Sequence, residues 1–148
     1  MSTPSRSRSA TDASQVLPPP APGATRIERI DTHRDARGLV FEPLDEAQLQ
    51  EQRNVHVVLT QPGETRGNHH HLSAVEITSV VGPCLIRLKE QGVLRELEVP
   101  AGETWRLVIP PGVTHAFRNT GSAPMVLVSF SSEVHDPSGA SLRRESIL

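Results

Sequence analysis

Residues 63–76 read Gly63-Glu-Thr-Arg-Gly-Asn-His-His-His-Leu-Ser-Ala-Val-Glu76, so three consecutive histidines are followed five residues later by a carboxylate. Side chains of an extended strand alternate between its two faces, which places His69 and His71 on one side and His70 on the other. Two imidazoles two residues apart, with a carboxylate from the next turn or strand, supply three ligands for a first-row transition metal. The segment therefore predicts a metal site built on a strand.

A second segment, residues 110–119, brings a fourth imidazole. Pro111-Gly112 predicts a tight turn, which can return His115 across the mouth of a barrel. A single histidine is most often a surface or hydrogen-bonded residue, and a run of three can occur in a loop without any metal. The combination favours a metal site made by His69, His71, Glu76 and His115, with about two positions of a six-coordinate sphere left for water or substrate.

Short strands separated by turn residues surround these two segments. The clearest is residues 54–60, which is β-branched and ends before the Pro62-Gly63 turn. We also expect a turn or two of helix within residues 44–53. Further strands are expected at residues 39–41, 76–81, 85–89, 94–99, 103–109 and 125–130. Such a series without a long helical pattern predicts an all-β sandwich or barrel.

The length of 148 residues suits one domain. Residues 1–24 are rich in Ser and Pro and predict a disordered tail, so the folded domain is expected at residues 25–148. Residues 136–148 are polar and predict a surface arm or an exchanged edge strand.

Charge and hydropathy narrow the class of protein. A net charge of -2 gives no reason to expect nucleic acid as a partner. No run reaches the roughly 18 apolar residues of a membrane span, and no secretion signal is visible, so a cytoplasmic location is expected. Cys84 is the only cysteine and lies among apolar residues, which predicts an inert side chain packed in a strand.

The two segments resemble the paired motifs of the cupins. The first spacing is Gly63-x5-His69-x-His71-x4-Glu76-x5-Gly82, and the second is Gly102-x7-Pro110-x-Gly112-x2-His115-x3-Asn119. The last gap of the first is one residue shorter than usual and the first gap of the second two longer, but both lie outside the ligand spacings. The resemblance covers about residues 27–135 and implies a double-stranded β-helix, or jelly-roll barrel, with the metal between its sheets. It also implies a homodimer.

A closer likeness involves residues 54–63, Arg66-Gly67-Asn68-His69, residues 110–119 and His135-Asp136-Pro137. These resemble the zinc-containing nucleotide-sugar epimerase domains of capsular polysaccharide assembly. Asp35-x-Arg37-Gly38 and the Arg66 segment are also similar to cupin-type 4-keto-sugar epimerases and ketoisomerases. The likeness implies an epimerase or isomerase for a nucleotide-linked keto sugar, with zinc as the expected metal and iron, nickel or manganese as alternatives.

This chemistry needs a base next to the ketone and a group that holds the enolate charge. His56 is the first candidate for the base, although a strand histidine can equally face solvent. His71 is a second catalytic candidate, because metal-free ketoisomerases use the His-x-His pair as acid and base. The chain has no tyrosine, so any second proton donor is a water, a histidine or a metal-bound group.

The diphosphate of such a substrate calls for guanidinium groups, which pair with phosphate in a bidentate fork. Arg37 and Arg66 are the first candidates. Arg87 shares a strand face with Lys89 and is a third candidate, although a solvated outer face is the commoner place for such charges.

Two other functions remain open. One is a metal-dependent cyclase or dioxygenase of secondary metabolism, and the other is a non-catalytic cupin that binds a small molecule. Zinc disfavours oxygen chemistry, whereas iron permits it. A barrel mouth ringed by arginines favours a diphosphate ligand, whereas an apolar mouth favours a polyketide-like one.

Overall fold

The structure is a computed structural model that describes residues 23–148. The predicted tail, residues 1–24, lies outside the described residues except for its last two positions. The elements are β1 (Arg26–Ile30), β2 (Thr32–Asp35), β3 (Gly38–Phe41), α1 (Glu46–Gln50), β4 (Asn54–Thr60), β5 (Thr65–His71), β6 (Glu76–Val81), β7 (Cys84–Glu90), β8 (Val93–Val99), β9 (Thr104–Ile109), β10 (Thr114–Asn119), β11 (Met125–Ser131) and β12 (Leu142–Arg144).

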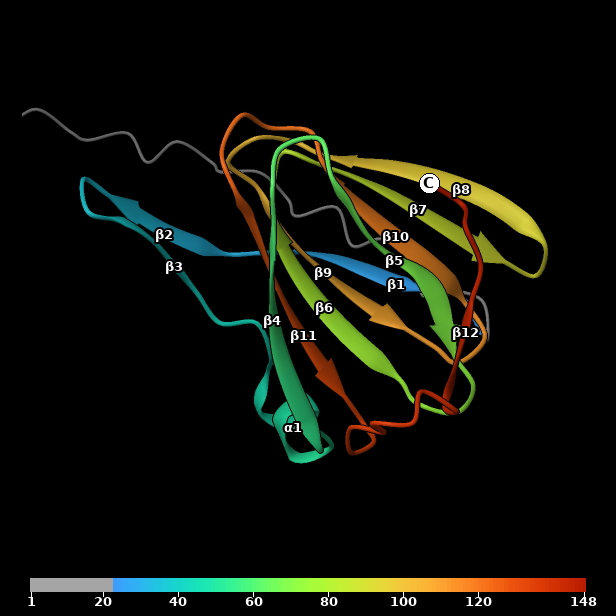
Figure 1. Cartoon of the computed structure of the whole chain (residues 1–148). Helices are drawn as coiled ribbons and strands as arrows, with labels where there is room; N and C mark the ends of the chain where they lie inside the picture. Colours follow the sequence, from blue (N-terminus) through green and yellow to red (C-terminus); the bar gives the residue numbers. More distant parts are fainter. Residues whose placement is uncertain (1–22) are drawn as a thin grey trace, which may run out of the picture.

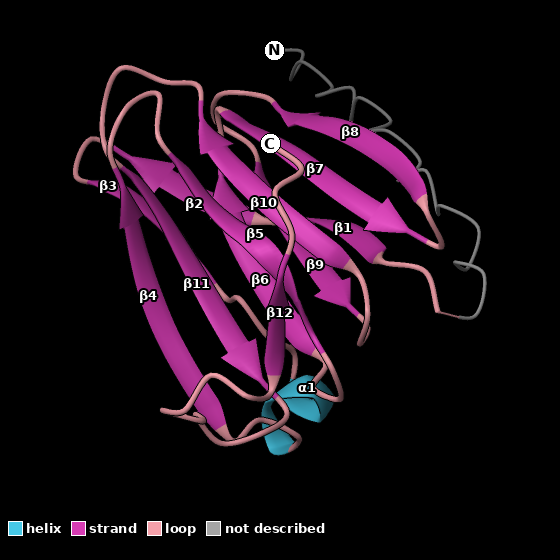
Figure 2. Ribbon diagram, turned by 45° about the vertical axis from the view of Figure 1, so that its right-hand side comes forward, coloured by secondary structure: helices cyan, strands magenta, loops and turns pink. Residues whose placement is uncertain are grey.

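Two five-stranded sheets face each other (Figures 1 and 2). One has the strand order β1-β9-β6-β11-β4, and the other has the order β12-β5-β10-β7-β8. Neighbouring strands in both sheets run antiparallel. The β2–β3 hairpin forms a separate small ladder that projects from the body in Figure 1. The expected all-β jelly-roll barrel is confirmed.

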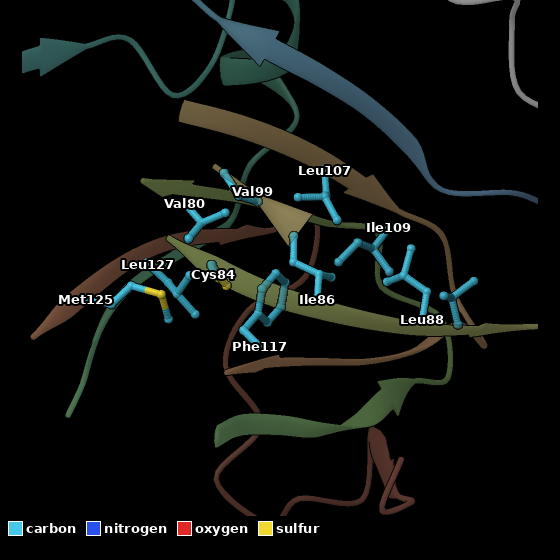
Figure 3. Packing of buried hydrophobic residues seen from close by; sticks show 11 residues of the cluster. Val80, Cys84, Ile86, Leu88, Val99, Leu107, Ile109, Phe117, Met125 and Leu127 are labelled. Carbon is cyan, nitrogen blue, oxygen red and sulfur yellow. The ribbon is translucent and has the colours of Figure 1, made fainter. Parts of the chain in front are cut away.

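The hydrophobic core lies between the two sheets (Figure 3). Strand β7 shows the pattern that builds it, because Cys84, Ile86 and Leu88 are buried while the residues between them face outward. Burying one such aliphatic side chain stabilises the fold by about 1.5–3 kcal/mol. Cys84 is packed in a strand, as expected, and burial raises the pKa of its thiol to about 12.

The expected elements agree with the structure to different degrees. Strands β4 and β6 have the expected bounds of residues 54–60 and 76–81, and α1 lies inside the expected helical segment. Strands β1, β2 and β10 were not expected as strands. Residues 142–144 of the polar last segment form the edge strand β12, which pairs with β5 of the same chain.

Among residues 23–148, no helix has the length and apolar character needed to cross a bilayer.

Candidate metal centre

Four side chains from three strands meet at one end of the core. His69 and His71 come from β5, Glu76 begins β6, and His115 belongs to β10. Their potential ligand atoms all lie within 4.8 Å of one another. His71 Nε2 lies 2.6 Å from Glu76 Oε2, and His115 Nε2 lies 3.6 Å from the same oxygen. The structure thus brings together all four residues that the sequence predicts as ligands.

Pairing between β5 and β10 sets this geometry. His115 is opposite His69, whereas Ala116 is opposite Gly67, so Asn68 is an extra residue in the ladder. Asn68 has a φ of 57°, which asparagine tolerates better than most residues. A Cβ on Gly67 would come within 2.6 Å of the His115 carbonyl oxygen, so this close approach requires glycine.

The bulge at Asn68 also changes which side chains share a face. Simple alternation puts Arg66 and His69 on opposite faces, because they are three positions apart in the sequence. The extra residue restores them to the same face, and Arg66 is opposite Phe117, whose side chain belongs to the core. His70 lies on the other face, where its Nδ1 is 3.1 Å from Thr114 Oγ1.

Burial and neighbouring charges shift the pKa values of the clustered residues in opposite directions. Burial alone would raise the pKa of Glu76, but the charge of His115 and hydrogen bonds from His71 and Thr78 hold it well below its ordinary value. Burial lowers the pKa of His69 to about 4, and the charge of His115 adds to this effect. Burial also acts to lower the pKa of His115, but the Glu76 charge outweighs it and raises that pKa.

A metal ion fits the donor atoms of this cluster. His115 Nδ1 donates to the Val113 carbonyl at 3.0 Å, which leaves Nε2 as the atom that faces the other ligands. That Nε2 is buried and has no hydrogen-bond partner among the described residues. Buried polar atoms are rarely left unpaired, and imidazole with carboxylate is a donor set that first-row metals prefer. These residues therefore suit a divalent transition metal.

Two buried hydroxyl groups support the carboxylate. Thr78 Oγ1 donates to Glu76 Oε1 at 2.7 Å and lies 2.7 Å from Ser129 Oγ. The bond leaves Glu76 Oε2 directed at the imidazoles. The sequence analysis did not identify these residues, and the alternation Glu76-x-Thr78 along β6 is the signal that could have found Thr78.

Three members of the cluster, His69, His71 and Glu76, line a cavity of ≈ 450 Å³. His56 of β4 also lines it, opposite Ser129 on the neighbouring strand, so the candidate base shares one cavity with three of the four proposed metal ligands. The segment between β11 and β12 contributes Glu133, His135 and Asp136. His56 itself is exposed to solvent.

None of the three predicted phosphate-binding arginines is among the residues that line the cavity. Arg66 lies on the ligand face of β5 but is exposed to solvent. Arg37 is at the tip of the β2–β3 hairpin, where it pairs with Asp35 at 2.5 Å. Arg87 is on the outer face of β7, where it bonds to Glu96 and to the Ile147 carbonyl. Both lie away from the cavity, contrary to expectation. Arg37 is on the projecting hairpin, and Arg87 faces outward because it alternates with the buried Ile86 and Leu88. Strand alternation in the sequence could not distinguish the inside of the barrel from its outside.

The family model of the polysaccharide biosynthesis C-terminal domain matches residues 33–141. The chain belongs to this family. The cupin fold expected from the two histidine motifs is also confirmed, because solved structures of cupin type share it. No sequence among the curated proteins matches this cupin.

Three solved structures show the likeness. Capsular polysaccharide assembling protein CapF from Staphylococcus aureus is 26% identical with a TM-score of 0.59, over 80% of this chain and 33% of that chain. QdtA, a sugar 3,4-ketoisomerase from Thermoanaerobacterium thermosaccharolyticum in complex with TDP, is 19% identical with a TM-score of 0.64, over 82% of this chain and 88% of that chain. The rmlC epimerase of Mycobacterium tuberculosis is 16% identical with a TM-score of 0.63, over 83% of this chain and 68% of that chain. The cupin described here spans about a third of the length of CapF.

Proposed function

We propose that this cupin is a metal-dependent epimerase or isomerase that acts on a nucleotide-linked keto sugar. The observation that carries the proposal is that His56 and the His69–His71–Glu76–His115 cluster contribute to one end of the barrel from different strands. Removal of a proton next to a ketone requires a base at the carbon and an electrophilic group at the ketone oxygen, and residues on different strands can supply the two. The sugar ketoisomerase and epimerase named among the similar structures support the same class of reaction.

The four clustered residues would hold one divalent metal, with zinc as the proposed ion and iron, nickel or manganese as alternatives. A metal held there would polarise the ketone oxygen of the substrate as a Lewis acid, which contributes several kcal/mol of transition-state stabilisation. The negative charge of buried Glu76 and the Val113 bond to His115 would fix the ligands in place.

His56 would take the proton from the carbon beside the ketone. It faces the cavity from β4, and its exposure leaves room for a substrate to approach. A base of this kind contributes about 10²–10⁴-fold to the rate. His135 also lines the cavity, so it can return a proton in place of the tyrosine that the chain lacks.

The polar side chains in the lining favour a sugar over a polyketide-like substrate. Besides the ligands they include Asn54, His56, Ser131 and Asp136, which can bond to hydroxyl groups. Arg66, on the ligand face of β5, would bind a phosphate of the substrate.

We also propose that two copies of the chain pair through β4. This strand ends its sheet and carries no charged Asp, Glu, Lys or Arg between Asn54 and Thr60. Its outer face exposes Val55, Val57 and Leu59. An uncharged, apolar edge strand is a surface that another strand can join.

Solvent deuterium exchange tests the proposed reaction. The protein, purified without a histidine tag, is incubated in D₂O with a panel of nucleotide-linked 4-keto-hexoses, and deuterium at the carbons beside the ketone is measured by NMR. We expect exchange with at least one sugar and a loss of about 100-fold or more in His56→Gln. His33→Gln is the matched control, because His33 lies on the projecting hairpin. No exchange with any sugar would overturn the proposal.

A further inference from the structure

The edge strand β12 places an unexpected arginine beside the metal centre. In its pairing with β5, Leu142 is opposite His71, Arg143 is opposite His70, and Arg144 is opposite His69. Directly opposed residues of an antiparallel pair point to the same face. Leu142 accordingly lines the cavity. Arg144 therefore lies on the face that carries the ligands, and Arg143 lies on the other.

Arg144 has no partner for its charge among the described residues. Within residues 23–148 its side chain makes no hydrogen bond or ion pair. The neighbouring cations behave differently, since Arg87 pairs with Glu96 and Lys89 pairs with Glu145. A guanidinium without an anion, next to a cluster that suits a metal cation, is a position that an anionic ligand would stabilise.

The backbone on both sides of Arg144 is held firmly. On one side is the β12 ladder. On the other, the Glu145 amide donates to the Asn68 carbonyl at 2.9 Å, and the Ile147 and Leu148 amides donate to Asn68 Oδ1 at 2.8 and 3.1 Å. The Glu145 carboxylate turns to the outer face, where it bonds to Lys89 and Thr114. Arg144 is therefore presented from a fixed strand, which lowers the entropy cost of binding a ligand.

Arg66 lies on the same face and also lacks an ion pair within the described residues. It is three residues before His69, which is at most about 10 Å along a strand. Besides the proposed ligand Glu76, the acidic residues of the cavity are Glu133 and Asp136, which belong to the segment next to the opposite end of β5, beyond His71. The positive charge is thus concentrated at the Arg66 end of the site.

We propose that Arg144 binds the diphosphate of the substrate together with Arg66, so that the sugar extends from this pair toward the metal centre and His56. This inference rests on the proposed function for the identity of the substrate. It adds a specific binding residue on β12 and replaces Arg37 and Arg87 in that role. Guanidinium suits the task because it bonds two phosphate oxygens at once.

Calorimetric titration with TDP, UDP and inorganic pyrophosphate tests the proposal. We expect Arg144→Gln to weaken binding of the diphosphates by about 10- to 100-fold, because a hydrogen bond to a charged group is lost. Arg144→Lys should recover only part of the affinity, since a lysine cannot form the fork. Arg143→Gln removes the same charge one residue away on the other face and should change affinity by less than about twofold.

The outcomes separate this inference from the proposed reaction. If Arg144→Gln binds the diphosphates as tightly as the wild type, the inference is overturned, whereas deuterium exchange by the wild type would still support the reaction. If binding depends on Arg144 but no keto sugar exchanges, the diphosphate site stands and the reaction is overturned. If the wild type binds none of the three probes, the inference is also overturned. An unchanged ratio of metal to protein in Arg144→Gln would show that the metal centre is intact.

Discussion

Thr78 donates a hydrogen bond from Oγ1 to Oε1 of Glu76 at 2.7 Å, and both side chains are buried. The bond fixes the carboxylate so that its other oxygen, Oε2, faces His71 and His115. A residue that orients a ligand in this way affects the metal affinity without touching the metal.

Thr78→Val should therefore weaken metal binding. The substitution keeps the shape of the side chain and removes the donor, so we expect the metal dissociation constant to rise by about 10- to 100-fold. Competition with a chromogenic chelator measures it. Thr78→Ser is the control, because it keeps the hydroxyl group. Equal affinities in the two variants would contradict the positioning role.

Adjacent histidines should differ sharply in their importance. His71→Gln removes an imidazole 2.6 Å from Glu76 Oε2 and should abolish stoichiometric metal binding. His70→Gln should bind metal like the wild type, because His70 faces Thr114 on the outer side of β5. Elemental analysis of the two purified variants compares them. Loss of metal in both variants would contradict the prediction, because it would mean that either substitution disrupts β5 as a whole and not only the face that carries the ligands.

The metal-free protein should be most stable near pH 6.5. The pKa of His69 is about 4 in the folded state against an ordinary 6.5, so the unfolded chain binds the proton first as the pH falls. The free energy of unfolding should therefore decrease from pH 6.5 toward pH 4. The pKa of His115 is raised, so its favourable interaction with Glu76 is complete below pH 6.5 and is lost as the pH rises through the folded-state pKa.

Urea unfolding of the metal-free protein at a series of pH values measures this profile. His69→Gln should flatten the decrease on the acid side, because it removes the group that causes it. The lowered pKa of Glu76 acts only at lower pH, since its contribution persists until the pH falls below 4.5. An acid limb of the same slope in His69→Gln would contradict this explanation.

A charge on the outer face of β4 should separate the proposed dimer. Val57 is 66% exposed at the centre of that face, and Val57→Lys would place an ammonium group in the interface. Light scattering coupled to size exclusion should show a monomer. Val93 is 67% exposed on β8 and gives a matched control, since Val93→Lys should leave the dimer intact. A monomeric wild type would disprove the pairing.

The sequence was informative where local periodicity decides the structure. Alternation along an extended strand separated His70 from His69 and His71, and turn residues marked most strand boundaries. The sequence could not predict which face of β5 carries Arg66, because the bulge at Asn68 depends on pairing with β10. The sequence also could not identify Arg144 as a site residue. Its position depends on the long-range pairing of β12 with β5, and a polar strand of three residues has no pattern that predicts such a pairing.

The central claim, that His69, His71, Glu76 and His115 hold one metal needed for the reaction, is tested most directly by a single titration. Protein purified without a histidine tag is stripped of metal and reloaded stepwise, and deuterium exchange into a nucleotide-linked keto sugar is measured at each ratio of metal to protein. We predict no exchange without metal and a linear rise that ends at about one ion per chain. Full exchange by the metal-free protein would contradict the claim.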